Sequence, residues 1–249
     1  MNKFWKGKFF RQETVDASKV LKENIVRAKV EDEWQEFKLI ELPDKFMRWN
    51  VERRLEMIKN LKEGKPPGLA GPHNAMVASY GDKRDDTRFR INNAVKGMGF
   101  LPRREKLDEI INLLKDTINK PMKEKLEILE NLYKKADEIF DKTKQISLEL
   151  YASPDFETHT FINEMINPAV SIVFLDIPSF EIKAIAHLLC PDDPKLSDYE
   201  KKVVEYANLV HDYFHGPFDK KFTAVIYYVI EVFDNSPGRK DAMGRRISP

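Results

Sequence analysis

The chain has 249 residues, of which 42% are hydrophobic, so it is long enough to bury a core in one large domain or two modest ones. Its 42 Lys and Arg residues balance 41 Asp and Glu residues, and a net charge of +1 gives no overall field that would draw the whole protein onto nucleic acid or an anionic membrane. The single cysteine, Cys190, excludes an intramolecular disulfide and a zinc site built from several thiolates of one chain.

The same features lead to an expected compartment. A lone cysteine fits a reducing environment, which predicts a cytoplasmic protein. The N-terminal sequence builds no apolar signal segment and no run of about eighteen apolar residues occurs, so we expect an unexported protein with no membrane partner. Glutamine occurs only at Gln12, Gln35 and Gln145 beside many Lys and Glu residues, a balance typical of proteins from hot environments.

The first segment, residues 1–102, begins with a predicted β-hairpin and helix. Residues 24–43 (NIVRAKVEDEWQEFKLIELP) alternate apolar and polar side chains on both sides of a turn, which is typical of a hairpin. Asp44 can cap the helix that follows, and the apolar face of this helix repeats through about Leu61 before Gly64 ends it.

Residues 64–102 are predicted to form a long ordered loop. They are dense in Gly and Pro and show no sustained helical or strand period. Loops of this length are uncommon inside a compact domain unless they are functional or disordered. Three roles stay open, namely an anion site, an arm between subunits, and a surface excursion. The side chains that could hold a phosphate or carboxylate are Lys83, Arg84, Arg88 and Arg90.

The second segment, residues 103–150, is predicted to be a helical hairpin. Its first helix carries a clean apolar stripe from Leu107 to Ile118. Pro121 is tolerated in a first turn and would open a second helix that runs to about Leu150, a length of roughly 45 Å at 1.5 Å per residue. Because the stripe of this second helix is wide, we expect two of its surfaces to be covered.

The last segment, residues 151–249, has the pattern of a separate unit. Residues 167–178 and 221–233 are predicted to be buried strands, with a short helix at 179–190 and a longer helix at 197–216 between them. A strand, a helical crossover and a strand favour a parallel or mixed sheet with helices on one face, as in split βαβ folds. The basic tail that follows has few cations and no interleaved aromatic residues, so nucleic acid is not an expected partner.

The sequence HDYFHGPF, residues 211–218, holds the strongest candidate site. His211 and His215 fall on the polar flank of the helix, four residues apart, and could reach a common metal ion, with Asp212 between them. A second interpretation is that a histidine in the last turn favours the negative end of the helix dipole. A third metal ligand would have to come through folding, for example from His159.

The predicted fold class is α+β, with an N-terminal hairpin and helix, a long Gly/Pro-rich loop, a long helical hairpin and a C-terminal ferredoxin-like sheet. No complete catalytic motif occurs, and the sequence indicates no particular cofactor. We therefore expect first a cytoplasmic accessory or structural subunit that acts as a homo-oligomer or within a larger enzyme complex. The alternative is a small-molecule enzyme in which His211, Asp212 and His215 supply metal ligands or a general base, while the loop arginines hold a small anionic substrate.

Overall fold

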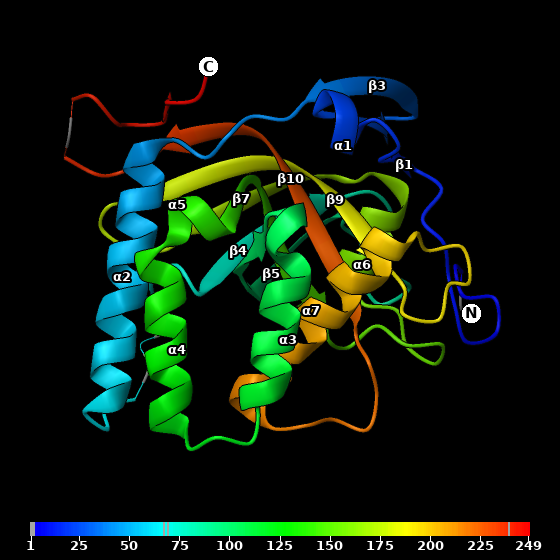
Figure 1. Cartoon of the computed structure of the whole chain (residues 1–249). Coiled ribbons are helices and arrows are strands. Elements are labelled where there is room, and N and C mark those ends of the chain that lie inside the picture. The colour runs from blue at the N-terminus through cyan, green and yellow to red at the C-terminus, as the bar shows by residue number, and fades with distance from the viewer. Residues whose placement is uncertain (1–2, 67, 69, 239) are drawn as a thin grey trace.

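The computed structural model describes residues 3–66, 68, 70–238 and 240–249 (Figure 1). Its main feature is an eight-stranded sheet with the order β5-β4-β8-β9-β10-β7-β6, in which β11 pairs with β10 and every pairing is antiparallel. The strands are β4 (Asn74–Tyr80), β5 (Ile91–Gly97), β6 (Gly99–Pro102), β7 (Phe140–Glu149), β8 (Ala169–Phe174), β9 (Phe180–Leu189), β10 (Thr223–Asp234) and β11 (Arg245–Arg246).

This sheet curls into a half-barrel because its two edge strands are consecutive in the chain. β5 pairs with β4 at one end of the strand order, and β6 pairs with β7 at the other end. Only Met98 separates β5 from β6, so the two edges of the sheet meet at this residue. The curl encloses one face of the sheet and brings side chains from distant parts of the sequence into one interior.

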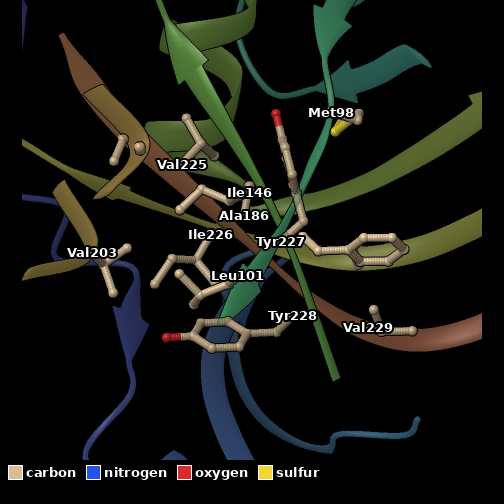
Figure 2. Packing of buried hydrophobic residues seen from close by; sticks show 14 of the residues in the cluster. Met98, Leu101, Ile146, Ala186, Val203, Val225, Ile226, Tyr227, Tyr228 and Val229 are labelled. Atoms are coloured by element: carbon tan, nitrogen blue, oxygen red, sulfur yellow. The ribbon is translucent and has the colours of Figure 1, made fainter. Parts of the chain in front are cut away.

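Helices lie on both faces of the curled sheet. α7 packs against β10 and β7 with α3 beside it, whereas α6 packs on β4, β5 and β9. In Figure 2, Ile226 and Tyr228 point toward the side where Val203 of α7 lies, and Tyr227 points away from it. α2 and α4 lie side by side (Figure 1). The helices are α1 (Val20–Glu23), α2 (Asp44–Lys62), α3 (Leu107–Thr117), α4 (Met122–Lys134), α5 (Ala136–Ile139), α6 (His159–Ile166) and α7 (Asp198–His215).

α2 is tied to the bend between the two edge strands by the buried residue Arg54. Its guanidinium donates to the carbonyl oxygens of Pro72 at 2.7 Å and Met98 at 2.8 Å, and to Asn50 Oδ1 at 2.7 Å. It also lies over the rings of Phe100 and Tyr133. A planar guanidinium with five donors suits this task, because it can satisfy several buried acceptors at once.

A separate three-stranded sheet confirms the predicted N-terminal hairpin. β2 (Ile25–Val30) and β3 (Glu33–Lys38) pair antiparallel, and β1 (Val15–Asp16) pairs with β2. The two turn residues, Glu31 and Asp32, both have positive φ, as the two-residue turn that matches strand twist requires. Val26 and Ala28 face inward and are fully buried.

The predicted helices at 44–61 and 197–216 are also confirmed. α7 begins with a capping box, in which Ser197 Oγ accepts from the Glu200 backbone N–H and the Glu200 carboxylate accepts from the Ser197 backbone N–H. No helix in the described part of the chain is long and apolar enough to cross a membrane.

The predicted long helical hairpin is wrong, because α3 packs chiefly against α7 and α4 chiefly against α2, and the second helix is much shorter than expected. Helical structure ends at Ile139, and residues 140–149, which were assigned to the second helix, form β7 between β10 and β6. Most of β7 is buried on both faces, so it lacks the apolar and polar alternation of a half-exposed strand. A short apolar run of this kind cannot be separated from a buried helix by its period alone.

The predicted C-terminal ferredoxin-like unit is also wrong. The expected strands at 167–178 and 221–233 exist as β8 and β10, but residues 179–190 form strand β9 between them instead of a helix. β9 is buried along nearly its whole length, which again hides the strand period. With β9 in place, all three strands pair antiparallel, and the parallel crossover is absent from this part of the sheet.

The predicted loop at 64–102 contains three strands of the main sheet. β4, β5 and β6 take up much of it, and their Gly, Ala and Asn residues have low strand propensity. Pairing with β8 and β7 overrides this local preference. As a result, the sheet takes strands from each of the three segments distinguished in the sequence, residues 1–102, 103–150 and 151–249.

Candidate functional site: an acid–base cluster inside the curled sheet

Polar side chains line the enclosed face of β7 and β10. Gln145, Ser147 and Glu149 alternate along β7 and therefore point to the same face. Gln145 lies directly opposite Tyr227 of β10, and directly opposite residues of an antiparallel pair share a face. All four residues are buried. This face of the sheet therefore carries a polar row in an otherwise apolar interior.

α6 brings a carboxyl group, that of Glu164, to this row. The helix begins after Thr158, whose hydroxyl accepts from the Phe161 N–H at 3.1 Å. The helix is fixed on the sheet by Asn163, whose side-chain amide donates to Ser79 Oγ at 3.2 Å and to the Arg90 carbonyl at 2.9 Å. These contacts hold Glu164, one residue further on, against β10.

β5 contributes a cation, Lys96. We call the group formed by Lys96, Gln145, Ser147, Glu149, Glu164 and Tyr227 the acid–base cluster. Lys96 Nζ contacts Glu149 Oε2 across the gap between β5 and the end of β7. The Lys96 side chain is 10% exposed and that of Glu149 is 1% exposed, so this ion pair is largely withdrawn from water. Thr158 Oγ1 donates to the second oxygen of Glu149 at 3.2 Å. The Glu149 carboxylate thus links β7, β5 and the start of α6.

Glu164 is fully buried and has an unusual protonation equilibrium. Tyr227 OH donates to Glu164 Oε1 at 3.3 Å. Burial is the main cause that raises the pKa of Glu164 to about 8; the negative charge of Glu149 acts in the same direction, and Lys96 and the Tyr227 hydrogen bond oppose it. Burial, reinforced by the two neighbouring carboxylates, also raises the pKa of Tyr227 well above its usual range. Glu164 therefore carries a proton at neutral pH, and Tyr227 stays protonated.

Three buried polar atoms of this face have no hydrogen-bond partner among the described residues. They are Gln145 Oε1, Ser147 Oγ and Glu164 Oε2. Most buried polar atoms in folded proteins are paired, and an unpaired one costs free energy, so three of them in one region call for an explanation such as a bound ligand. Gln145 and Ser147 share the inner face of β7 with Glu149, and Gln145 lies opposite Tyr227, whose hydroxyl contacts Glu164.

This arrangement is suited to proton transfer. A carboxyl group whose pKa lies near neutrality can both give and accept a proton at physiological pH. Perturbed carboxyl groups next to a specific charged partner are concentrated at functional sites. Lys96 can stabilise negative charge that develops near it, because a low-dielectric interior strengthens such an interaction.

The predicted histidine site lies elsewhere, at the end of α7. The rings of His211 and His215 are 4.8 Å apart, and His211 packs against Phe218 and Phe222. Burial, and then the neighbouring His215, lower the pKa of His211. Asp212 Oδ1 is 3.9 Å from His211 Nδ1. In the described part of the chain no three His, Cys, Asp or Glu side chains are grouped as a metal site would require, so the metal and general-base roles stay predictions.

The predicted anion-binding residues lie between β4 and β5, near a hollow of about 420 Å³. Lys83 and Arg84 line this hollow, whereas Arg88 and Arg90 are exposed and do not line it. Arg84 is engaged by Asp86 at 2.8 Å and stacks over Phe156. Carboxylates outnumber cations along the hollow, which disfavours an anion there, and the anion role stays a prediction. The charged lining consists of Lys3, Lys83, Arg84, Asp82, Asp85, Asp86, Asp155 and Glu157.

The sequence analysis does not predict any residue of this cluster as a site residue. The sequence predicts a loop around Lys96 and a helix around Glu149, so it does not place the two residues on strands of one sheet. The sequence does not mark Glu164 either, because the burial of every residue in the stretch TFINEM becomes visible only in the fold. Buried ionisable residues are rare unless they are paired or functional.

Neither a protein-family model nor a curated protein matches the chain.

Proposed function

We propose that this protein is an enzyme that moves a proton on a small polar molecule held between β5, β7, β10 and α6. The observation that carries the proposal is the carboxyl group of Glu164, which is fully buried with one oxygen on Tyr227 and the other without a partner among the described residues. A site of this kind leaves one oxygen free to exchange a proton with a bound molecule.

The ionisable residues of the cluster each have a role in this proposal. Glu164 is the general acid and base, because it can change protonation state near neutral pH. Tyr227 orients its carboxyl group by donating to Oε1. The Lys96–Glu149 ion pair, which Thr158 helps to fix in place, tunes the carboxyl group of Glu164, because Lys96 lowers its pKa and Glu149 raises it.

The test compares wild-type protein with the Glu164→Gln variant on a mixture of small metabolites, followed by mass spectrometry. We expect the wild type to consume at least one compound, and the variant to do so at least about a hundredfold more slowly, the usual size of a general acid–base contribution. The matched control is Glu181→Gln, on the opposite face of the same sheet. Equal consumption by Glu164→Gln, or none by the wild type, contradicts the proposal.

A second candidate function is assembly, the role expected first from the sequence. The observation that favours it is an apolar patch on the outer face of the β4–β5 hairpin. Tyr80, Ile91 and Val95 are 52%, 62% and 70% exposed, and Tyr80 lies directly opposite Ile91. Large apolar side chains that share one exposed face often mark an interface. Native mass spectrometry tests this candidate by the mass of the intact species.

A further inference from the structure

The charges of the cluster do not balance without a bound cation or a proton. The cluster holds one cation, Lys96, and two carboxyl groups, Glu149 and Glu164, and all three side chains are largely or fully buried. Lys96 and Glu149 neutralise one another. An isolated charge is costly in such surroundings, so Glu164 either binds a proton or is compensated by one positive charge from outside.

The unpaired atoms of the cluster have a common chemical character. Gln145 Oε1 is an acceptor, an ionised Glu164 Oε2 is an acceptor, and Ser147 Oγ can accept as well as donate. What all three can bind is a hydrogen-bond donor. A protonated primary amine carries one positive charge and three N–H donors, so it matches both the missing charge and the three free acceptors.

We propose that the cluster binds a small protonated amine, R–NH₃⁺, which takes the place of the proton on Glu164. This inference rests on the proposed function and adds the class of substrate. The amine donates to Glu164 Oε2, Ser147 Oγ and Gln145 Oε1, and it enters past Lys96, the member of the ion pair that reaches the surface.

The proton balance of the site follows from this arrangement. Glu164 starts as the neutral acid and releases its O–H proton to solvent as R–NH₃⁺ binds, which leaves an ammonium–carboxylate pair. Transfer of one N–H proton to Glu164 Oε2 then breaks an N–H bond, forms an O–H bond and leaves R–NH₂ with a free electron pair. The step needs no oxidant or reductant, and it prepares the amine nitrogen to act as a nucleophile.

Methylammonium is the probe for the experiment, and isothermal titration calorimetry in two buffers of different ionisation enthalpy is the method. We expect about one proton to be released per methylammonium bound at about pH 6, where Glu164 is protonated in the free protein. The association constant is expected to rise about tenfold for each pH unit between about pH 6 and 7, because the proton and the cation compete for one carboxylate.

Substitutions show which residues are needed for methylammonium binding and proton release. Glu164→Gln is expected to weaken methylammonium binding at least about tenfold and to abolish proton release, since an amide does not titrate. Ser147→Ala removes one acceptor of the amine and is expected to weaken binding with the fold intact, because Ser147 Oγ has no hydrogen-bond partner among the described residues. Glu181→Gln, on the outer face, is expected to behave as the wild type. Potassium, which has the charge but no N–H donor, is expected to compete only weakly.

The outcomes separate this inference from the proposed function. No binding, binding without proton release, equal binding by Glu164→Gln, or equally strong competition by potassium overturns the amine site. If the metabolite test then shows consumption of a compound without an amine that depends on Glu164, the enzyme stands and the amine class falls. Methylammonium binding with proton release, but without consumption of any metabolite, keeps the amine site and removes the enzyme.

Discussion

Glu164 differs from the other glutamates of the sheet in what surrounds its carboxyl group. Glu149 has the ammonium of Lys96 and the hydroxyl of Thr158, and Glu181 has Lys183 and Ser171, which lower its pKa against the effect of burial. Among the described residues, Glu164 has only the tyrosine hydroxyl as a partner, and a nearby carboxylate adds to the cost of ionising it. The neutral acid is therefore its stable form when the interior holds nothing else.

This protonation makes the stability of the fold depend on pH. The pKa of Glu164 is raised to about 8 in the folded chain from the ordinary glutamate value of 4.5. The contribution of its proton to the free energy of unfolding is therefore complete below about pH 4.5 and is lost as the pH rises through about 8. We expect the free energy of unfolding of the wild type to fall by about 3 to 5 kcal/mol across this range relative to that of Glu164→Gln.

Urea denaturation of both proteins at several pH values measures this difference directly. Taking the difference removes the contribution of groups common to both proteins. One of these groups is His187, whose pKa is lowered by burial. Its contribution to the free energy of unfolding is therefore lost as the pH falls through its folded pKa, whereas that of Glu164 is lost as the pH rises. Parallel stability curves for the wild type and Glu164→Gln would show that Glu164 is ionised in the folded protein, which would contradict its role as a neutral acid.

At the scale of elements, the position of α6 depends on its close approach to the end of β4. A Cβ atom on Gly81 would lie 2.9 Å from Asn163 Cα and 3.0 Å from its carbonyl oxygen. These are backbone atoms, which cannot move aside as a flexible side chain can. The absence of a side chain at Gly81 therefore lets the helix lie against the sheet at the depth that brings Glu164 to Tyr227.

Gly81→Ala is accordingly expected to destabilise the protein by about 1 to 3 kcal/mol, the usual cost of overpacking. Gly97→Ala is the matched control, because a Cβ atom there would have no atom of the described residues within 4 Å and alanine suits a strand better than glycine. Urea denaturation of the two variants provides the measurement. Equal stability of both would mean that α6 can shift away from β4 without loss.

The elements that could be predicted from the sequence are those with one exposed face. α2 and α7 carry an apolar stripe, and the capping box of α7 marks its start in the sequence. The β2–β3 hairpin shows alternation on both sides of its turn. β7 and β9 were mistaken for helix because burial of both faces removes the alternation that identifies a strand. Their identity is decided by the strands that pair with them.

At the scale of the whole molecule, the candidate site exists only because the sheet curls. Lys96, Glu149, Glu164 and Tyr227 come from four elements spread over more than half of the chain. No spacing in the sequence relates them, and the curl depends on β5 and β6 being separate partners of β4 and β7. The pair of histidines in α7 was easier to notice because a helix places residues four apart on one face, but the fold does not bring either histidine into the interior cluster of Glu164.

The outer face of the same hairpin leads to a prediction about the state of the whole molecule. Lys96 and its neighbours at alternate positions of β5 point into the interior, so Ile91 and Val95 must point outward, where both are more than half exposed. If this face is an interface, a lysine at its centre would be desolvated without a partner. Val95→Lys should then weaken association by at least about a hundredfold, since an unpaired buried charge costs about 3 kcal/mol or more.

Leu21→Lys is the control for this experiment, because Leu21 is an exposed apolar residue on α1, next to the other sheet. Native mass spectrometry and size-exclusion chromatography at matched concentrations should give an assembly for the wild type and Leu21→Lys, and a monomer for Val95→Lys. A wild-type monomer, or an unchanged assembly in Val95→Lys, removes the role of this face. The acid–base cluster lies on the opposite side of β5, so assembly and chemistry can be tested independently on one strand.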